Sequence, residues 1–256
     1  MGFGAKLTNI FSHEFSIDTL DGQRGLRYRQ RWSSNMTERH EPVIEAGTKR
    51  DASLKDSNQW PDYTSVTFAP DLRRFGMSQV DADVASILTR RVYDIAACLD
   101  SLSVSLNGHS ISLSDPTTTN FEGYMKLFSP IDAPAPHFVN VNKRWQVGVM
   151  LSHDAQFSNI SFVNAIATIK GGTHVNLVTD QITKHIAAHI CKTYKNEGLE
   201  CSAKDVRPYL CVFVNAVINN PAFDSQTKET LTTKVDDFGS SCKLSTKFLN
   251  SLVSSL

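Results

Sequence analysis

An almost wholly apolar run constrains the fold of this chain most. Residues 211–218 read Cys-Val-Phe-Val-Asn-Ala-Val-Ile, and such a run is typical of a strand covered on both faces. A helical pattern at residues 174–194 precedes it, and two strand-like runs, residues 144–152 and 159–166, precede the helix. We predict that residues 153–155 join these two runs as a hairpin turn and that the helix crosses over to the apolar strand. The predicted fold class is therefore α+β, built from two-layer α/β sandwiches.

The first half of the chain also contains strand and helix patterns. Residues 15–19, 25–32 and 63–68 alternate apolar with polar side chains, so we expect an antiparallel meander of half-buried strands. The charged residues 38–62 are predicted to form a mobile, solvated loop or a hairpin extension. A helix is expected over residues 81–97. Its buried stripe is expected to consist of Val84, Ile87, Leu88, Val92 and Ile95.

Prolines indicate where the chain divides into domains. A short strand at residues 103–106 ends in the turn pair Asn107-Gly108, and residues 114–136 then contain four prolines. A chain of 256 residues that is 41% hydrophobic can bury a sizeable core, and its length allows two modest domains. We predict a first domain over residues 1–113 and a second over residues 114–256, which ends in a helix.

Charge and cysteine content exclude several classes of protein. Basic and acidic residues number 26 each, so no global positive charge drives binding to nucleic acid or to anionic lipid. No apolar run approaches the roughly 18 residues that span a bilayer, and we expect no membrane partner. The cysteines are odd in number and lack CxxC spacing, which indicates reduced thiols in a cytosolic or nuclear protein. They are Cys98, Cys191, Cys201, Cys211 and Cys242.

A glycine-rich segment at the start of the sequence has the chemistry of a phosphate site. Gly2-Phe3-Gly4-Ala5-Lys6 precedes apolar residues at helical spacing, so we expect a loop that opens a helix. Glycines permit close backbone approach, a helix start offers free N–H groups, and the lysine adds positive charge. The alternative is a loose chain end, because the segment lacks the GxxxxGK[ST] spacing of a phosphate-binding loop.

Two further lysines stand on candidate anion-binding turns. Lys228 lies on a turn-rich loop directly after the buried strand, a place where binding groups commonly occur. An ordinary surface lysine is the alternative. Lys170-Gly171-Gly172 can form an anion-binding nest or a strand-to-helix turn, and we favour the turn.

The remaining charged clusters favour structural interpretations. The most basic patch consists of Arg24, Arg27, Arg29 and Arg31. These side chains can contact phosphates, but in a neutral chain a solvated strand face is favoured. Lys192 and Lys195 stand at the end of the long helix, where they also complement the helix dipole. His185 and His189 have a metal-binding spacing without an evident third ligand, which favours a helix surface.

Taken together, these segments resemble the eukaryotic-type DNA topoisomerase II family. The most specific matches are FVNAIATIKGGTHV at residues 162–175 and NPAFDSQTKE at residues 220–229. GFGAKLTNIFS at residues 2–12, RRVYDIA at residues 90–96 and FGSSCKLS at residues 238–245 match in the same order. The resemblance covers essentially the whole chain.

This resemblance implies the last part of a GHKL-type ATPase domain followed by a transducer domain. It also implies ATP as the nucleotide, DNA as a partner, a homodimer formed through the amino-terminal gate, and a nuclear location. In the family one loop wraps the ATP phosphates, and the lysine of a Gln-Thr-Lys loop contacts the terminal phosphate. The residues that match these two loops are Gly2, Phe3, Gly4, Ala5, Lys6, Gln226, Thr227 and Lys228. The residues that match the DNA-facing segment are Lys192, Lys195 and Asn196.

The resemblance further implies that the catalytic groups lie outside this chain. In the family, the glutamate that activates water, the asparagine that holds Mg²⁺ and the acidic residue that reads adenine all precede the glycine loop. The DNA-cleaving domains are also missing from these 256 residues. We therefore expect a segment of an ATP-dependent DNA topoisomerase that is not catalytic alone. The alternative is a short non-catalytic interaction module that binds or competes with full-length topoisomerase II.

Overall fold

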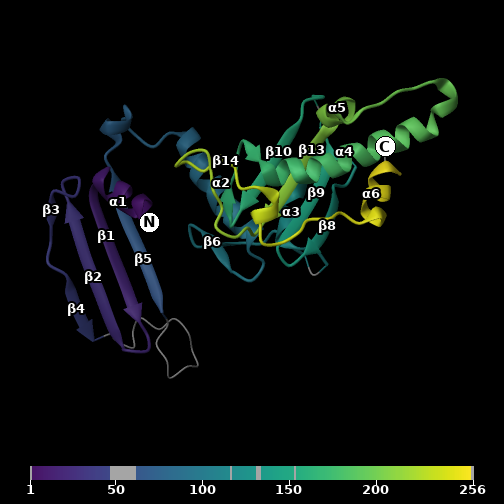
Figure 1. Ribbon diagram of the computed structural model, residues 1–256. Coiled ribbons are helices and arrows are strands. Elements are labelled where there is room, and N and C mark those ends of the chain that lie inside the picture. Colours follow the sequence, from purple (N-terminus) through teal and green to yellow (C-terminus); the bar gives the residue numbers. More distant parts are fainter. Residues whose placement is uncertain (1, 47–61, 116, 131–133, 153, 255–256) are drawn as a thin grey trace. The chain divides into compact units, whose positions relative to one another are not determined.

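The computed structural model describes residues 2–46, 62–115, 117–130, 134–152 and 154–254 (Figure 1). By its internal contacts the chain divides into two compact units, Met1–Ala85 and Ser86–Leu256. Each unit has its own sheet. The domain boundary predicted after residue 113 stays a prediction.

The first unit is an antiparallel sheet with one short helix. Its elements are α1 (Phe3–Ile10), β1 (Ser12–Asp21), β2 (Leu26–Ser33), β3 (Glu38–Arg39), β4 (Val43–Ala46), β5 (Tyr63–Pro70) and the 3₁₀ turn η2 (Leu72–Phe75). The sheet order is β3-β2-β1-β5, with β4 also paired to β2. Antiparallel pairing is confirmed, but the predicted meander is wrong because β5 pairs with β1. The outer edge of β2 is not free for β5, since β3 and β4 occupy it.

The charged stretch after β2 is partly strand. β3 and β4 are short, exposed strands, so the hairpin extension is the correct alternative for residues 38–46. Residues 47–61 lie outside the described residues, and the mobile loop predicted for them stays a prediction.

The second unit is a mixed sheet with helices. Its helices are α2 (Ala82–Cys98, which begins in the first unit), α3 (Asn120–Lys126), α4 (Thr173–Thr193), α5 (Ala203–Val206) and α6 (Thr246–Val253), with 3₁₀ turns η3 (Lys195–Glu197), η4 (Arg207–Tyr209) and η5 (Val235–Asp237). Its strands are β6 (Val104–Leu106), β7 (His109–Ile111), β8 (His137–Asn142), β9 (Trp145–Leu151), β10 (Ser158–Val163), β11 (Ile166–Ala167), β12 (Gly171–Gly172), β13 (Leu210–Ala216) and β14 (Thr230–Leu231). The main sheet has the order β11-β10-β13-β9-β8.

The predicted crossover is present in this sheet. β10 and β13 are parallel neighbours, and α4 connects them, which confirms the strand–helix–strand arrangement. The hairpin predicted between β9 and β10 is wrong, because β13 lies between them and pairs antiparallel with β9. Every residue of β13 is buried. The most apolar strand thus takes the centre of the sheet and separates two strands that adjoin in sequence.

Helices cover both faces of the main sheet. On one face, Val178 and Ile182 of α4 pack in the cluster that contains Val212 and Val214 of β13. On the other face, the aromatic residues of α3 pack with Phe213. The α+β class is confirmed. Helix α3, which the sequence patterns did not predict, begins after Thr119, whose side chain accepts a hydrogen bond from the Glu122 backbone N–H.

Helix α2 forms where it was predicted, but it buries a different face. Ile87 and Leu88 of the predicted stripe are 58% and 57% exposed. The buried face instead carries Asp94, Ala96 and Ala97. Asp94 accepts a hydrogen bond of 2.5 Å from the Tyr124 hydroxyl of α3, so small residues and one satisfied carboxylate form the packed face. The expected buried stripe is therefore wrong.

Candidate functional site

The Gln-Thr-Lys segment lies at the tip of a hairpin that follows β13. The two arms of the hairpin are joined by a hydrogen bond from Thr232 N to Ala222 O (2.9 Å) and one from Asp224 N to Thr230 O (3.2 Å). At the tip, Lys228 N donates to Ser225 O at 3.1 Å, which closes a four-residue turn. We refer to residues 222–232 as the Gln-Thr-Lys hairpin.

The side chains at this tip are available for binding. Gln226 and Thr227 are exposed, and Lys228 is partly buried. The Lys228 Nζ lies 6.0 Å from the centroid of the Phe223 ring, which orients the ammonium group through a cation–π contact. Among the described residues, no carboxylate forms an ion pair with Lys228. The tip therefore presents one positive charge and two polar side chains.

Acidic residues near the tip are committed to other partners. Hydrogen bonding from Thr230 holds the pKa of Asp224 below its usual range. Glu229 pairs with Lys170 at 2.5 Å between Oε2 and Nζ, and this pairing raises the pKa of Lys170. Neither carboxylate forms an ion pair with Lys228 in this structure.

The hairpin docks onto the start of α4. β14 pairs in parallel with β12, and Lys170 N donates to Glu229 O at 3.0 Å. Gly172 has φ +134, and a Cβ there would lie 2.3 Å from Leu231 O, so only glycine allows this approach. The strand-to-helix turn predicted for this segment is present, and the backbone of Gly171 and Gly172 pairs with β14.

Two turns of the main sheet anchor the base of the hairpin. Arg144 Nη2 donates to Asn219 Oδ1 at 2.6 Å, and its Nη1 donates to Gly239 O at 3.0 Å. From the β10–β11 turn, Asn164 Oδ1 accepts from Ile218 N at 2.9 Å, while its Nδ2 donates to Ile218 O at 3.0 Å. The sequence patterns predicted neither anchor, although the positive φ turn at Asn164 is typical of asparagine.

The glycine segment is helix rather than loop. Gly2 is the N-cap of α1, so Phe3, Gly4, Ala5 and Lys6 all lie within the helix. Ala5 and Lys6 are good helix formers, which lets the helix begin before the apolar residues. The expected loop at residues 3–6 is therefore wrong, but the first N–H groups of α1 remain without intrahelical partners. This segment belongs to the first unit.

The predicted DNA-facing residues surround the end of α4. Lys192 stands in its last turn, and Lys195 and Asn196 lie in η3. All three side chains are exposed. Their neighbour Gly198 ends η3 with φ +69, which reverses the chain before α5.

The arginine patch and the histidine pair have structural roles. Each arginine of the patch pairs with an acidic residue of the same sheet: Arg24 with Asp21, Arg27 with Asp18, Arg29 with Glu45, and Arg31 with Glu14. The solvated strand face is thus the correct alternative. His185 contacts Asn250, and His189 contacts Thr193. In the part of the chain that the structure describes, no cluster of three or more His, Cys, Asp or Glu residues can hold a metal ion.

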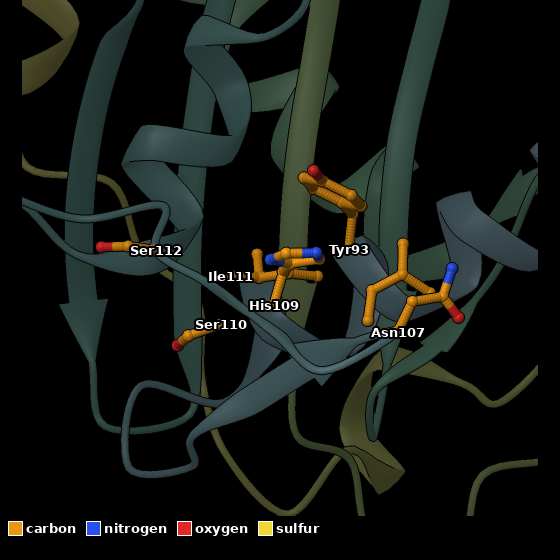
Figure 2. A pocket seen from close by; sticks show the side chains of 7 residues that line it. Tyr93, Asn107, His109, Ser110, Ile111 and Ser112 are labelled. Carbon is orange, nitrogen blue, oxygen red and sulfur yellow. The ribbon is translucent and has the colours of Figure 1, made fainter.

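A pocket in the second unit holds none of the predicted site residues. It has a volume of about 370 Å³ and lies between α2 and the β6–β7 hairpin (Figure 2). Tyr93 and His109 contribute its rings, and no acidic, lysine or arginine side chain lines it. Its chemistry does not indicate a phosphate site. Over the described ranges, no helix combines the length and apolarity that crossing a bilayer requires.

Comparisons with known proteins agree on one family. The family model of DNA gyrase B matches residues 111–254. The chain is 48% identical over 256 residues to DNA topoisomerase 2 of Arabidopsis thaliana, covering 97% of this chain and 16% of that protein. It is 40% identical to DNA topoisomerase 2 of Saccharomyces cerevisiae, covering 98% of this chain and 18% of that protein.

Solved structures agree with this result. The ATPase and transducer domains of DNA topoisomerase II from Balamuthia mandrillaris match with a TM-score of 0.88 and 44% identity, covering 99% of this chain and 61% of that one. The ATPase region of Saccharomyces cerevisiae topoisomerase II matches with a TM-score of 0.85 and 41% identity over the same shares. The chain thus spans less than a fifth of the length of these two curated relatives. It belongs to the DNA gyrase B family and corresponds to part of the ATPase and transducer region of type II DNA topoisomerases.

Proposed function

We propose that this chain is a segment of an ATP-dependent type II DNA topoisomerase, in which it links nucleotide binding to DNA passage. Residues 1–113 would form the end of the GHKL-type ATPase domain, and residues 114–256 the transducer domain. The observation that carries the proposal is the tip of the Gln-Thr-Lys hairpin. It presents Gln226, Thr227 and Lys228 above a hydrogen-bonded base, and among the described residues no carboxylate forms an ion pair with the lysine.

The hairpin tip suits the terminal phosphate of ATP. The Lys228 ammonium supplies a full positive charge, and a charge-assisted hydrogen bond to phosphate contributes about 1.5–3 kcal/mol. Gln226 and Thr227 add neutral donors beside it. ATP, when bound, supplies the phosphoanhydride bond that is broken, while these residues bind and orient its end. Arg144 and Asn164 already anchor the base of the hairpin. The tip is therefore expected to lose less conformational entropy when it binds the nucleotide.

The start of α1, by itself, has the chemistry of a phosphate site. Its first free N–H groups and the positive end of the helix dipole attract anions, and Lys6 adds charge in the first turn and a half. By the resemblance to the topoisomerase II family, we place the Mg²⁺ ligands and the water-activating base outside these 256 residues. The part that we assign to these 256 residues is to bind the nucleotide and to orient its phosphates.

Helix α4 provides a path from nucleotide to DNA. Its first residue follows Gly172, which docks against the hairpin, and its 21 residues span about 32 Å at 1.5 Å per residue. Lys192, Lys195 and Asn196 stand at the far end. We propose that these side chains contact the DNA backbone, that the protein acts as a homodimer closing through its amino-terminal gate, and that it works in the nucleus.

Substitution of Lys228 tests the proposal. In the longest native product that contains this chain, Lys228→Ala is expected to lower the ATPase kcat by about 10²–10³-fold. Lys234→Ala is the matched control, because this exposed lysine follows the same hairpin but lies outside its tip. Residues 1–256 alone are expected to hydrolyse no ATP. Equal kcat values for the two variants, or Lys228-dependent hydrolysis by residues 1–256, would overturn the proposal.

The similarity to ATPase and transducer regions supports this function. No observation on the described residues favours the short interaction module over it.

A further inference from the structure

Two cysteines are in contact near the end of α4 and the start of α5. Cys191 lies in the last turns of α4, and Cys201 stands two residues before α5. Cys201 N donates to the Cys191 Sγ at 3.2 Å, and the same Sγ donates to Cys201 O at 3.3 Å. The backbone of one cysteine therefore touches the thiol of the other.

The fold holds these two residues together from both sides. α4 and α5 pack against each other, and Val206 of α5 is buried in the core cluster with Ile186 and Ala187 of α4. Asp205 accepts a hydrogen bond of 2.8 Å from Ser202 N, which fixes the start of α5. The contact is thus set by packing and not by the nine-residue connection alone.

The Cys201 thiol makes one weak contact. Its Sγ donates a weak hydrogen bond of 3.8 Å to Ser202 O, which costs little to break. Both cysteines are partly exposed. Staggered rotamers differ only by rotation about χ1. Because the Cys191 Sγ already lies 3.2 Å from Cys201 N, we expect that rotation of the Cys201 side chain can bring the two sulfur atoms together.

The other three thiols are poorly placed for oxidation. Burial raises the pKa of Cys242 to about 12 and raises the pKa values of Cys98 and Cys211. The thiolate is the reactive form, so these side chains stay protonated and shielded. Burial and the charge of Asp205 also raise the pKa of Cys201, so its reaction is expected to quicken as pH rises.

We propose that Cys191 and Cys201 form a redox-modifiable dithiol, which a hydroperoxide converts to a disulfide. The O–O bond of hydrogen peroxide breaks as one thiolate sulfur attacks it, giving a sulfenic acid and the first water. The second thiolate then displaces hydroxide from that sulfur, forming the S–S bond and the second water. Two thiols together lose two electrons and two protons, which the peroxide takes up. This site does not depend on the proposed function.

The disulfide would close the segment of residues 192–200. This segment contains Lys192, Lys195 and Asn196, so oxidation would restrict the motion of the end of α4. Cross-linking a short loop removes conformational freedom from it. Amide hydrogen exchange in residues 192–200 is expected to slow on oxidation and to recover on reduction.

Peptide mapping after peroxide treatment tests the proposal. Residues 1–256 are treated with hydrogen peroxide, the remaining thiols are alkylated under denaturing conditions, and the chain is cut after lysine. Cleavage after Lys192 and Lys195 separates the two cysteines, so a disulfide keeps their peptides joined until a reductant is added. The expected result is that joined pair, with a mass lower by two hydrogens than the sum of the free peptides.

Three variants complete the test. Cys191→Ser and Cys201→Ser are each expected to abolish the joined pair, whereas the control Cys98→Ser leaves it intact. Because serine is nearly isosteric, a near-native circular dichroism spectrum checks that each variant folds. Alkylation of both Cys191 and Cys201 after peroxide treatment, joined peptides that involve other cysteines, or sulfinic acid without a cross-link would each overturn the proposal.

Discussion

The α-carbon of Gly239 lies directly against the side chain of Asn219. A Cβ on Gly239 would stand 2.1 Å from Asn219 Nδ2, and the glycine has φ +73. The same asparagine accepts the 2.6 Å hydrogen bond from Arg144. This packing fixes Asn219, three residues before the Gln-Thr-Lys hairpin. Gly239, which follows the hairpin in sequence, therefore helps to position its base.

Gly239→Ala separates the effect of this contact from that of backbone conformation. Gly198 has a similar φ of +69 but nothing within 4 Å of a Cβ, so Gly198→Ala measures the left-handed strain alone, about 1–2 kcal/mol. Gly239→Ala is expected to lower the free energy of unfolding by a further ~1–3 kcal/mol through overpacking. Urea denaturation of both variants gives the comparison. Equal losses would show that the contact with Asn219 is unimportant.

Arg144→Lys tests the two-acceptor anchor. A lysine has one nitrogen and cannot bridge Asn219 and the Gly239 carbonyl as a guanidinium does. The expected loss of one charged hydrogen bond is about 1.5–3 kcal/mol, which predicts at least a tenfold faster amide exchange in residues 219–233. The exposed neighbour Lys143 provides the control, as Lys143→Ala removes a charge without this bridge. Unchanged exchange in Arg144→Lys would contradict the anchor.

His174 predicts a pH dependence of stability. It is fully buried at the start of α4, its Nε2 contacts Thr168 Oγ1 at 3.1 Å, and burial lowers its pKa to about 3. Between pH 6.5 and 3 the unfolded chain binds a proton at this ring and the folded chain does not. The free energy of unfolding therefore falls with falling pH, by about 1.4 kcal/mol per unit from this group.

Urea denaturation of His174→Asn at pH 7, 6 and 5 checks this dependence. The variant loses the histidine's contribution, so its stability should decline less steeply with acid than that of the wild type. All other histidines titrate in both proteins and cancel in the comparison. Parallel pH profiles would show that His174 does not drive the loss.

The lysines at the end of α4 predict a salt-dependent DNA contact. If Lys192 and Lys195 each neutralise a phosphate, replacing one with alanine reduces the slope of log affinity against log salt by about 0.9 for duplex DNA. Lys234→Ala should leave the slope unchanged. Fluorescence anisotropy with a labelled duplex at several salt concentrations measures it. A uniform slope across all the variants would remove this segment from the DNA interface.

Local pattern predicted the elements, whereas contacts distant in sequence decided their arrangement. Residues 211–218 carry the signature of a buried strand by themselves, and β13 is central in the sheet. The spacing of residues 144–166 carries no sign that β13 inserts between β9 and β10. That spacing alone predicts a hairpin of β9 and β10. In the structure β13 lies between these two strands and pairs with both of them.

The candidate site shows the same division. Gln226-Thr227-Lys228 can be identified from the resemblance, but the base of the hairpin depends on Arg144 meeting Asn219 across 75 residues. In α2 the amphipathic pattern located the helix but not its buried face. The buried face contains Asp94, whose carboxylate accepts a hydrogen bond from the Tyr124 hydroxyl of α3. The proline-containing sequence around α3 did not predict that helix.

Labelling with an ATP analogue that carries a photoreactive group on its terminal phosphate tests the role of the hairpin tip most directly. In the native protein that contains this chain, we predict a labelled peptide that includes residues 226–228. The label should be competed by ATP, diminished in Lys228→Ala and retained in Lys234→Ala. Competed labelling elsewhere in the protein, with residues 226–228 unlabelled, would contradict the assignment of the hairpin tip to the terminal phosphate.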